Sequence, residues 1–379
     1  MDDKDAIAEG WRLGRMGDVA LARGDGETAH RCFQEALPLF RQAEDFNGEA
    51  DCLSELGAMA LRRSDHETAR HLYEEALPLY QQLKDLVGEA SCVRGLGEIA
   101  RIRSDHETAH RRFEEALRLC KLGEDADGRA DCLWSLGSIA LGQSKHETAG
   151  RLFEEALAVN RHTGNRIGQA NCQLGLAHIA RVLSQRDVAE KRYEEALALF
   201  RQTGALHGEA HCISGQGALA FTAKDLETAS QCYGEALALY QQVGDVLGQA
   251  NCISRLGTIA FDRADCETSA RRCEEALPLY RQVGDVLGGA NCIRRLGEIA
   301  LRRSDAAAAR QRFAQALGMY ERIADSFSIG ETHRLMARIA RSEAEKRQHL
   351  RAARNIWNSI QRSDLVQKLE KEFGSSVLR

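Results

Sequence analysis

Cysteine returns along this chain at a fixed interval of 40 residues, and such a ladder of thiols could hold metal ions or carry redox chemistry. Zinc sites use closely spaced pairs such as CxxC or CxxH, and the chain contains neither. Packed helices lie roughly 10 Å apart, whereas a disulfide needs Cα atoms within about 7 Å. We therefore predict that these cysteines are small, buried, apolar side chains, with reduced thiols, at Cys52, Cys92, Cys132, Cys172, Cys212, Cys252 and Cys292.

Histidine follows the same interval at His66, His106 and His146, which raises the possibility of a metal ladder. An interval of one repeat separates these imidazoles too widely for them to share one ion. We predict that they are residues of a helix start, and we expect neither a metal nor a cofactor.

Two common catalytic motifs are missing from the sequence. It contains no GxxxxGK[ST] phosphate loop and no GxSxG. The glutamate pairs of the recurrent EEAL segments fall at exposed helical spacing, whereas catalytic carboxylates need an enclosed site. We therefore predict that the protein is not an enzyme, although a groove that serves as an active site is a third alternative.

The interval of 40 residues extends to the elements that must position these side chains. It aligns Gly48 with Gly88 and Gly288, and LGAMA at 56–60 with LGEIA at 296–300. Eight repeats of 40 residues occupy 1–327, and 328–379 holds a degenerate ninth repeat with a C-terminal capping helix. We predict one continuous solenoid.

Each repeat contains two amphipathic helices, since apolar residues recur at three- and four-residue spacing. The segment Ser64-Asp65-His66-Glu67 matches a capping box, in which a side-chain acceptor precedes glutamate by three residues. Glycines such as Gly164 and Gly244 are typical of helix C-termini, and Asp245 is placed to cap the next helix. The pattern predicts an all-α fold, a right-handed α-solenoid superhelix of antiparallel helix pairs.

These residues resemble the tetratricopeptide repeat (TPR) family. LxxLGxxA at 53–60, followed by Ala69, Tyr73 and Ala76, is similar to the family's spacing of small and large residues. The 40-residue length is most similar to the variety found in G-protein-signalling modulators, kinesin light chains and the sensor arrays of signalling ATPases. The resemblance implies that the first helix of each pair lines a concave groove and that the protein binds other proteins.

Residues on the non-core side of the first helices differ from repeat to repeat, and we predict that they form the partner-binding groove. Trp134, Phe221 and Phe261 would supply an apolar strip with two leucines, or else simply cover neighbouring helical turns. Arginines near the C-terminal end would attract an acidic segment of a partner, or else form an ordinary solvated face. The predicted groove residues are Trp134, Leu141, Leu174, His178, Arg181, Phe221, Arg255, Phe261, Arg294, Arg295, Arg302, Arg334 and Arg338.

Charge and hydropathy narrow the function further. The 379 residues include 51 basic and 56 acidic side chains, a net charge of −5, which argues against nucleic acid as a partner. The N-terminal segment lacks the pattern of a signal peptide, and no apolar run reaches membrane-spanning length, so we expect a cytoplasmic location and no membrane partner.

The function that we predict is a non-enzymatic protein-interaction scaffold that binds a peptide or helical segment in the concave groove. The alternative is a sensor or oligomerisation array that regulates a larger signalling ATPase or effector. Self-association is compatible with both.

Overall fold

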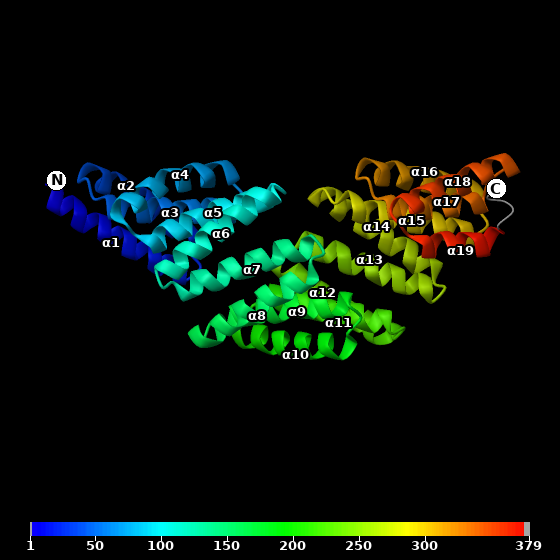
Figure 1. Cartoon of the computed structure of the whole chain (residues 1–379), viewed down its shortest axis with the longest axis horizontal. Helices are drawn as coiled ribbons and strands as arrows, with labels where there is room; N and C mark the ends of the chain where they lie inside the picture. Colours follow the sequence, from blue (N-terminus) through cyan, green and yellow to red (C-terminus); the bar gives the residue numbers. More distant parts are fainter. Residues whose placement is uncertain (1, 375–379) are drawn as a thin grey trace. The chain divides into compact units, whose positions relative to one another are not determined.

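The computed structural model describes residues 2–374 and contains no strand within them (Figure 1). The chain divides into two compact units, unit 1 (Met1–Thr203) and unit 2 (Gly204–Arg379). Unit 1 contains α1 (Asp3–Ala22), α2 (Gly26–Gln42), α3 (Phe46–Arg62), α4 (His66–Leu83), α5 (Leu86–Ile102), α6 (His106–Leu122), α7 (Ala126–Gly142), α8 (His146–Thr163), α9 (Arg166–Val182) and α10 (Arg186–Thr203). Unit 2 contains α11 (Leu206–Thr222), α12 (Leu226–Val243), α13 (Val246–Asp262), α14 (Cys266–Val283), α15 (Val286–Arg302), α16 (Ala306–Arg322), α17 (Ser326–Arg338), α18 (Glu343–Ser359) and α19 (Ser363–Phe373).

Consecutive helices form pairs, and the pairs stack within each unit. In unit 1, α3 packs on α4, α4 on α5, and α3 also contacts α5; in unit 2, α13, α14 and α15 repeat this arrangement (Figure 1). Odd-numbered helices therefore lie beside one another on one side of each unit. We call this side the first-helix face, formed in unit 1 by α1, α3, α5, α7 and α9 and in unit 2 by α11, α13, α15 and α17. The all-α solenoid of helix pairs that the sequence predicts is confirmed.

Turns within and between the pairs use different chemistry. At the turn before α4, Ser64 adopts a positive φ of 61°, and Asp65 is the N-cap, whose carboxylate accepts a hydrogen bond from the backbone N–H of Thr68 at 3.1 Å. The prediction of a capping box that starts at Ser64 is therefore wrong by one residue, because Ser64 makes the left-handed turn. Between pairs, Gly244 takes φ 73° as predicted, and Asp245 caps α13 through the N–H of Gly248 at 2.9 Å.

The recurrent glycine near the start of several first helices lies against an aromatic ring of the preceding helix, whereas Gly128 and Gly168 lie against Cys120 and Asn160. A Cβ added to Gly88 would lie 2.2 Å from Cε1 of Tyr80, and one added to Gly48 would lie 2.3 Å from Cε1 of Phe40. Both rings are buried. Only a residue without a side chain lets these rings pack where one helix pair meets the next.

All seven ladder cysteines are buried and free, which confirms their predicted packing role. Burial raises the pKa of the thiols of Cys92 and Cys212 to about 12, so both are neutral at pH 7. The sequence did not indicate that the thiol of Cys292 donates a hydrogen bond to Oγ of Ser254 at 3.6 Å, or that the thiol of Cys92 donates one to Oγ of Ser54 at 4.0 Å. These contacts add weak polar links to an apolar core.

The C-terminal helices close unit 2. Leu350 and Trp357 of α18 are buried and pack with Leu365 and Leu369 of α19. Helix α19, which begins at Ser363 and ends at Phe373, is the C-terminal helix that the sequence predicts. Within the described part of the chain, none of the helices combines the length and the apolar character that crossing a membrane requires.

Candidate functional site

The first-helix face of unit 1 is hollowed beside Trp134. A cavity of about 360 Å³ is lined by Trp134, Leu61, Arg94 and Asp131 together with small residues of α5 and α7. The Trp134 side chain is 36% exposed, and Arg94 donates a hydrogen bond to Asp131 at 2.9 Å beside it. Burial raises the pKa of Asp131, whereas Arg94 opposes that rise. This cavity offers an apolar surface beside an ion pair, a combination that suits a partner's apolar side chain.

A second cavity of about 360 Å³ in unit 1 is acidic. Asp18, Asp51 and Glu55 line it with Trp11. Burial raises the pKa of Asp51 and of Glu55, and in Asp51 a hydrogen bond donated by Tyr80 opposes the rise. This end of the first-helix face therefore presents carboxyl groups, in contrast to the arginines of the cavity in unit 2.

Unit 2 holds a more polar cavity of about 340 Å³, in which three predicted groove arginines meet. Glu298 accepts hydrogen bonds from Arg294 at 2.5 Å and from Arg295 at 2.7 Å, so one carboxylate holds both guanidinium groups. Arg255 is exposed, and within residues 2–374 no acidic side chain pairs with it. Arg255 is therefore the cation of this cavity that is left for a partner.

Phe261 does not contribute apolar surface to the groove, which corrects the expectation from the sequence. Its side chain is buried, with the guanidinium carbon of Arg302 3.4 Å from the ring centroid and that of Arg295 at 4.3 Å. Arg302 also donates a hydrogen bond to the backbone carbonyl of Phe261 at 2.7 Å. The two arginines are held by stacking on this ring, because flat guanidinium groups pack well on aromatic faces.

The last predicted arginines are engaged within the protein. Arg334 pairs with Glu331 on its own helix and with Glu372 of α19 at 2.7 Å, and Arg338 donates a hydrogen bond to Glu372 at 2.6 Å. These ion pairs lower the positive charge that the sequence led us to expect at this end.

The other predicted groove residues are partly exposed, but they line none of the three cavities described above. In unit 1, the rings of His178 and Tyr193 lie 5.8 Å apart; in unit 2, Lys224 lies over the ring of Phe221. The predicted apolar strip combines Trp134 and the two leucines of unit 1 with Phe221 of unit 2. Because it spans both units, the strip stays a prediction. The remaining residues of this group are Leu141, Leu174 and Arg181.

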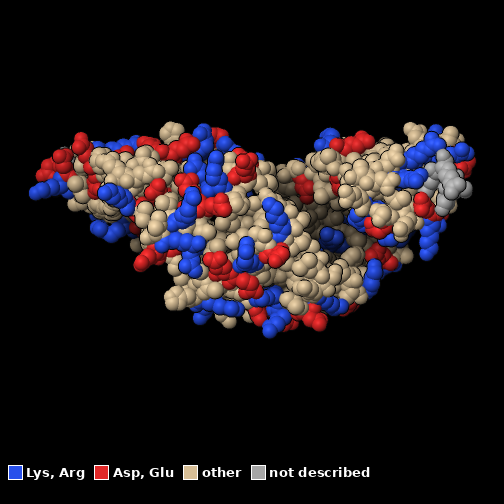
Figure 2. Space-filling view, in the orientation of Figure 1, with Lys and Arg blue, Asp and Glu red and all other residues tan. Residues whose placement is uncertain are grey.

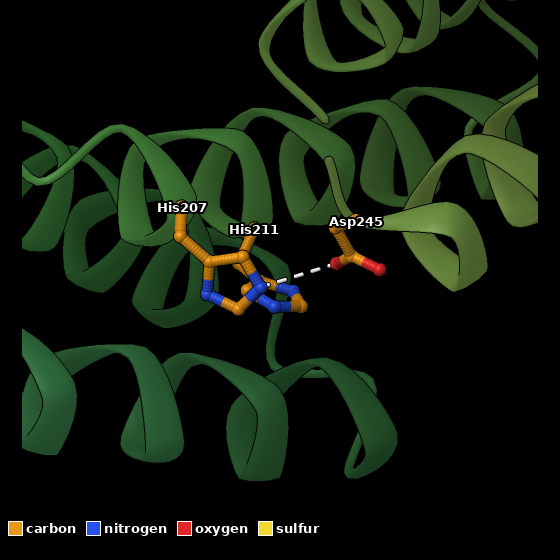
Figure 3. Close-up of side chains that lie close together, drawn as sticks. All are labelled: His207, His211 and Asp245. Atoms are coloured by element: carbon orange, nitrogen blue, oxygen red, sulfur yellow. Dashed lines mark hydrogen bonds and ion pairs between the residues drawn. The ribbon is translucent and has the colours of Figure 1, made fainter. Parts of the chain in front are cut away.

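One cluster of potential ligands was missed by the sequence reasoning. His207 and His211 lie one turn apart on α11, and Asp245 caps α13 beside them; one potential ligand atom from each lies within 4.8 Å of the other two (Figure 3). Burial, and then His207, lower the pKa of His211. The spacing His-x-x-x-His within a helix was the signal that could have found this cluster.

Charged side chains of both signs are interspersed over the visible face of the molecule (Figure 2). That face carries no broad basic stripe of the kind that neutralises a phosphate backbone.

The chain matches one known protein family along most of its length. The family described as "Tetratricopeptide repeat" matches residues 7–82, 88–162 and 249–322, more than half of the chain. No curated protein sequence is significantly similar to it.

Three solved structures share the fold at low sequence identity. The apo quorum sensor NprR from B. thuringiensis has a TM-score of 0.61 at 14% identity and covers 100% of this chain and 99% of its own. Apo RapI has a TM-score of 0.66 at 12% identity and covers 93% of this chain and 98% of its own. A signal-transduction ATPase with a tetratricopeptide repeat sensor, from Pyrococcus horikoshii, has a TM-score of 0.60 at 14% identity, with coverage of 83% of this chain and 47% of its own.

Proposed function

Because this chain belongs to the tetratricopeptide repeat family, we propose that it is a non-catalytic scaffold that binds a peptide or a helical segment of another protein on its first-helix face. Proteins of this family are generally interaction scaffolds. The observation that carries the proposal is the contrast between buried positions such as Ala36, Ala76 and Ala116, where the same residue recurs, and the first-helix face, which differs between repeats and is hollowed.

Trp134 is the proposed anchor in unit 1. A half-exposed tryptophan beside a polar rim is typical of residues that dominate binding energy once a partner covers them. The pair formed by Arg94 and Asp131 would then fix the orientation of the partner rather than supply most of the affinity.

Arg255 is the proposed contact for an acidic group in unit 2. Its charge lies in a cavity with polar side chains and has no acidic partner of its own in the described residues. An incoming carboxylate can pair with a guanidinium through two parallel hydrogen bonds. The free thiols of the core suit a reducing compartment, so we place this function in the cytoplasm.

The test begins with peptides selected from a displayed random library on the purified chain, whose affinity is then measured by fluorescence anisotropy. Trp134→Ala should weaken binding by about 30-fold, the loss expected for a central aromatic anchor. Leu122→Ala is the matched control, because Leu122 is 72% exposed but lines none of the three cavities on the first-helix face, and it should leave the affinity unchanged. Equal affinities for Trp134→Ala and the unmodified protein would place the binding surface elsewhere.

A sensor or oligomerisation array is the second candidate, and the similarity in fold to the tetratricopeptide repeat sensor of the Pyrococcus horikoshii ATPase favours it. In that case, an ATPase encoded beside this chain should change its rate of ATP hydrolysis when the purified chain is added. An unchanged rate together with peptide binding at Trp134 would favour the scaffold alone.

A further inference from the structure

Two imidazoles and a carboxylate converge on the first-helix face of unit 2. Nε2 of His207 lies 3.1 Å from Oδ2 of Asp245, and the rings of His207 and His211 meet edge to face with centroids 4.5 Å apart (Figure 3). The histidines come from α11 and the aspartate from the start of α13, so two helices fix the cluster.

The spacing of the donor atoms fits a metal ion. Zinc binds imidazole nitrogen and carboxylate oxygen at about 2.0 Å, which places neighbouring ligand atoms of a tetrahedral site roughly 3.3 Å apart. One donor pair already lies at 3.1 Å, and the most widely separated pair is within 4.8 Å. The His207 side chain is 59% exposed, so its ring is free to make the small rotation that would close the remaining gap.

Surrounding hydrogen bonds support two of the three donors. The hydroxyl of Tyr240 lies 2.9 Å from Nδ1 of His211 and holds the orientation of that ring, and Oδ1 of Asp245 accepts the N–H of Gly248 at 2.9 Å. Partners of this kind orient ligands in metal sites and raise their affinity for the ion.

The other repeats show that folding does not require these histidines. The residue equivalent to His207 is Leu247 in the next repeat, and the residue equivalent to His211 is Asn251, whose side chain accepts the corresponding tyrosine hydrogen bond at 3.0 Å. The aspartate cap, by contrast, serves other first helices as well. The sixth repeat therefore adds two nitrogen donors to a capping carboxylate that is already in place.

From this geometry we propose that His207, His211 and Asp245 bind a divalent transition-metal ion of the zinc class. Three protein donors leave one position of a tetrahedral site open to water or to a donor from another molecule. The site belongs to unit 2 and does not depend on the proposed binding of peptides at Trp134.

The test uses the full chain without a histidine tag, stripped of metal by a chelator and kept reduced. Co²⁺ is titrated in and followed by visible absorption, and Zn²⁺ is then added to displace it. We expect one Co²⁺ per chain with nitrogen and oxygen ligands and no thiolate charge-transfer band. A titration without one-to-one binding, or one dominated by thiolate bands, would overturn the proposal.

Matched variants come from the protein's own repeats. His207→Leu and His211→Asn copy the seventh repeat. Loss of a residue that only supports a metal ligand typically lowers metal affinity by roughly 10- to 100-fold. Each of these variants removes a ligand itself, so each should lower the affinity for Co²⁺ by more than that. Asp245→Asn should keep the cap, because Asn165 caps α9 through Gly168 at 2.9 Å, and should also weaken Co²⁺ binding.

Asp285→Asn is the control, since Asp285 caps α15 without a neighbouring histidine, and it should bind Co²⁺ as the unmodified chain does. Unchanged circular dichroism of the metal-free variants confirms folding. Full binding by His207→Leu and His211→Asn would show that the ion binds elsewhere.

Discussion

The hydroxyl of Tyr80 donates a hydrogen bond to Oδ1 of Asp51 at 2.9 Å and so joins the two helices of one pair. Tyr280 makes the same link to Asn251 at 3.0 Å. In both cases the tyrosine ring also covers the glycine that starts the next pair, so one side chain connects three helices.

Replacement of Tyr80 by Phe should lower the free energy of unfolding by about 1 kcal/mol, because a buried hydrogen bond is lost while the ring is kept. The pKa of Asp51 should rise further, since the Tyr80 hydrogen bond holds it down against burial. Urea unfolding measures the first effect and NMR titration of the carboxyl the second. Tyr73→Phe is the control, because within the described residues the Tyr73 hydroxyl forms no side-chain hydrogen bond; an equal loss in both variants would contradict the assigned role of the Tyr80 link.

Addition of a single methyl group at Gly88 should destabilise the stack. The new Cβ would lie 2.2 Å from the buried ring of Tyr80, so we expect Gly88→Ala to cost about 1–3 kcal/mol in the free energy of unfolding. Gly234→Ala is the matched control: a Cβ on this α12 residue meets nothing within 4 Å, and alanine should stabilise the helix by up to about 1 kcal/mol. Denaturant unfolding compares the two, and opposite signs are expected.

Helix α8 lacks the side-chain cap that α2, α4 and α6 have at their N-termini. Lys145 occupies the N-cap position and makes no side-chain hydrogen bond there, whereas Asp105 caps α6 through the N–H of Thr108 at 3.0 Å. Lys145→Asp should therefore stabilise α8 by about 1 kcal/mol, and Asp105→Ala should destabilise α6 by a similar amount. Hydrogen exchange at the first turn of each helix reads these effects locally, and faster exchange in Lys145→Asp would contradict the assignment.

The stability of the packing between α17 and α18 should fall in acid. Nδ1 of His333 lies 3.0 Å from Nδ1 of His349, and burial, together with the neighbouring ring, lowers the pKa of His333 to about 4. His333 takes up a proton near pH 6.5 in the unfolded chain but only near pH 4 in the folded chain. The contribution of the neutral imidazole to the free energy of unfolding is therefore complete above about pH 6.5 and is lost as the pH falls toward about 4. Because His333 is only partly buried, we expect a loss of about 1 kcal/mol.

His333→Gln removes this titration, and glutamine already occupies the equivalent position as Gln173. Its urea midpoint should change less between pH 7 and pH 5 than that of the unmodified chain. His71→Gln, at an exposed histidine, should leave the pH dependence as it was; the same flattening in that variant would show that the effect is not specific to the pair.

The repeat interval predicted the helix pairs, the buried cysteines and the glycine ends of the second helices, because these features depend on packing that is the same in every repeat. It did not predict which groove residues would be engaged within the protein. Phe261 is covered by Arg302, and Glu372 binds Arg334, because pairing across helices depends on the residues that happen to differ. The ligand cluster was missed for the same reason, since it needs residues of two neighbouring repeats at once.

The contact between Gly88 and Tyr80 has a consequence for how such a chain can change in length. Where a repeat carries this glycine and the repeat before it carries the ring, a break inside either repeat separates the two contact partners. Gain or loss of a complete 40-residue repeat of this kind keeps each glycine against a ring. Recombination between copies of the encoding segment can therefore lengthen or shorten this protein without redesigning its interior.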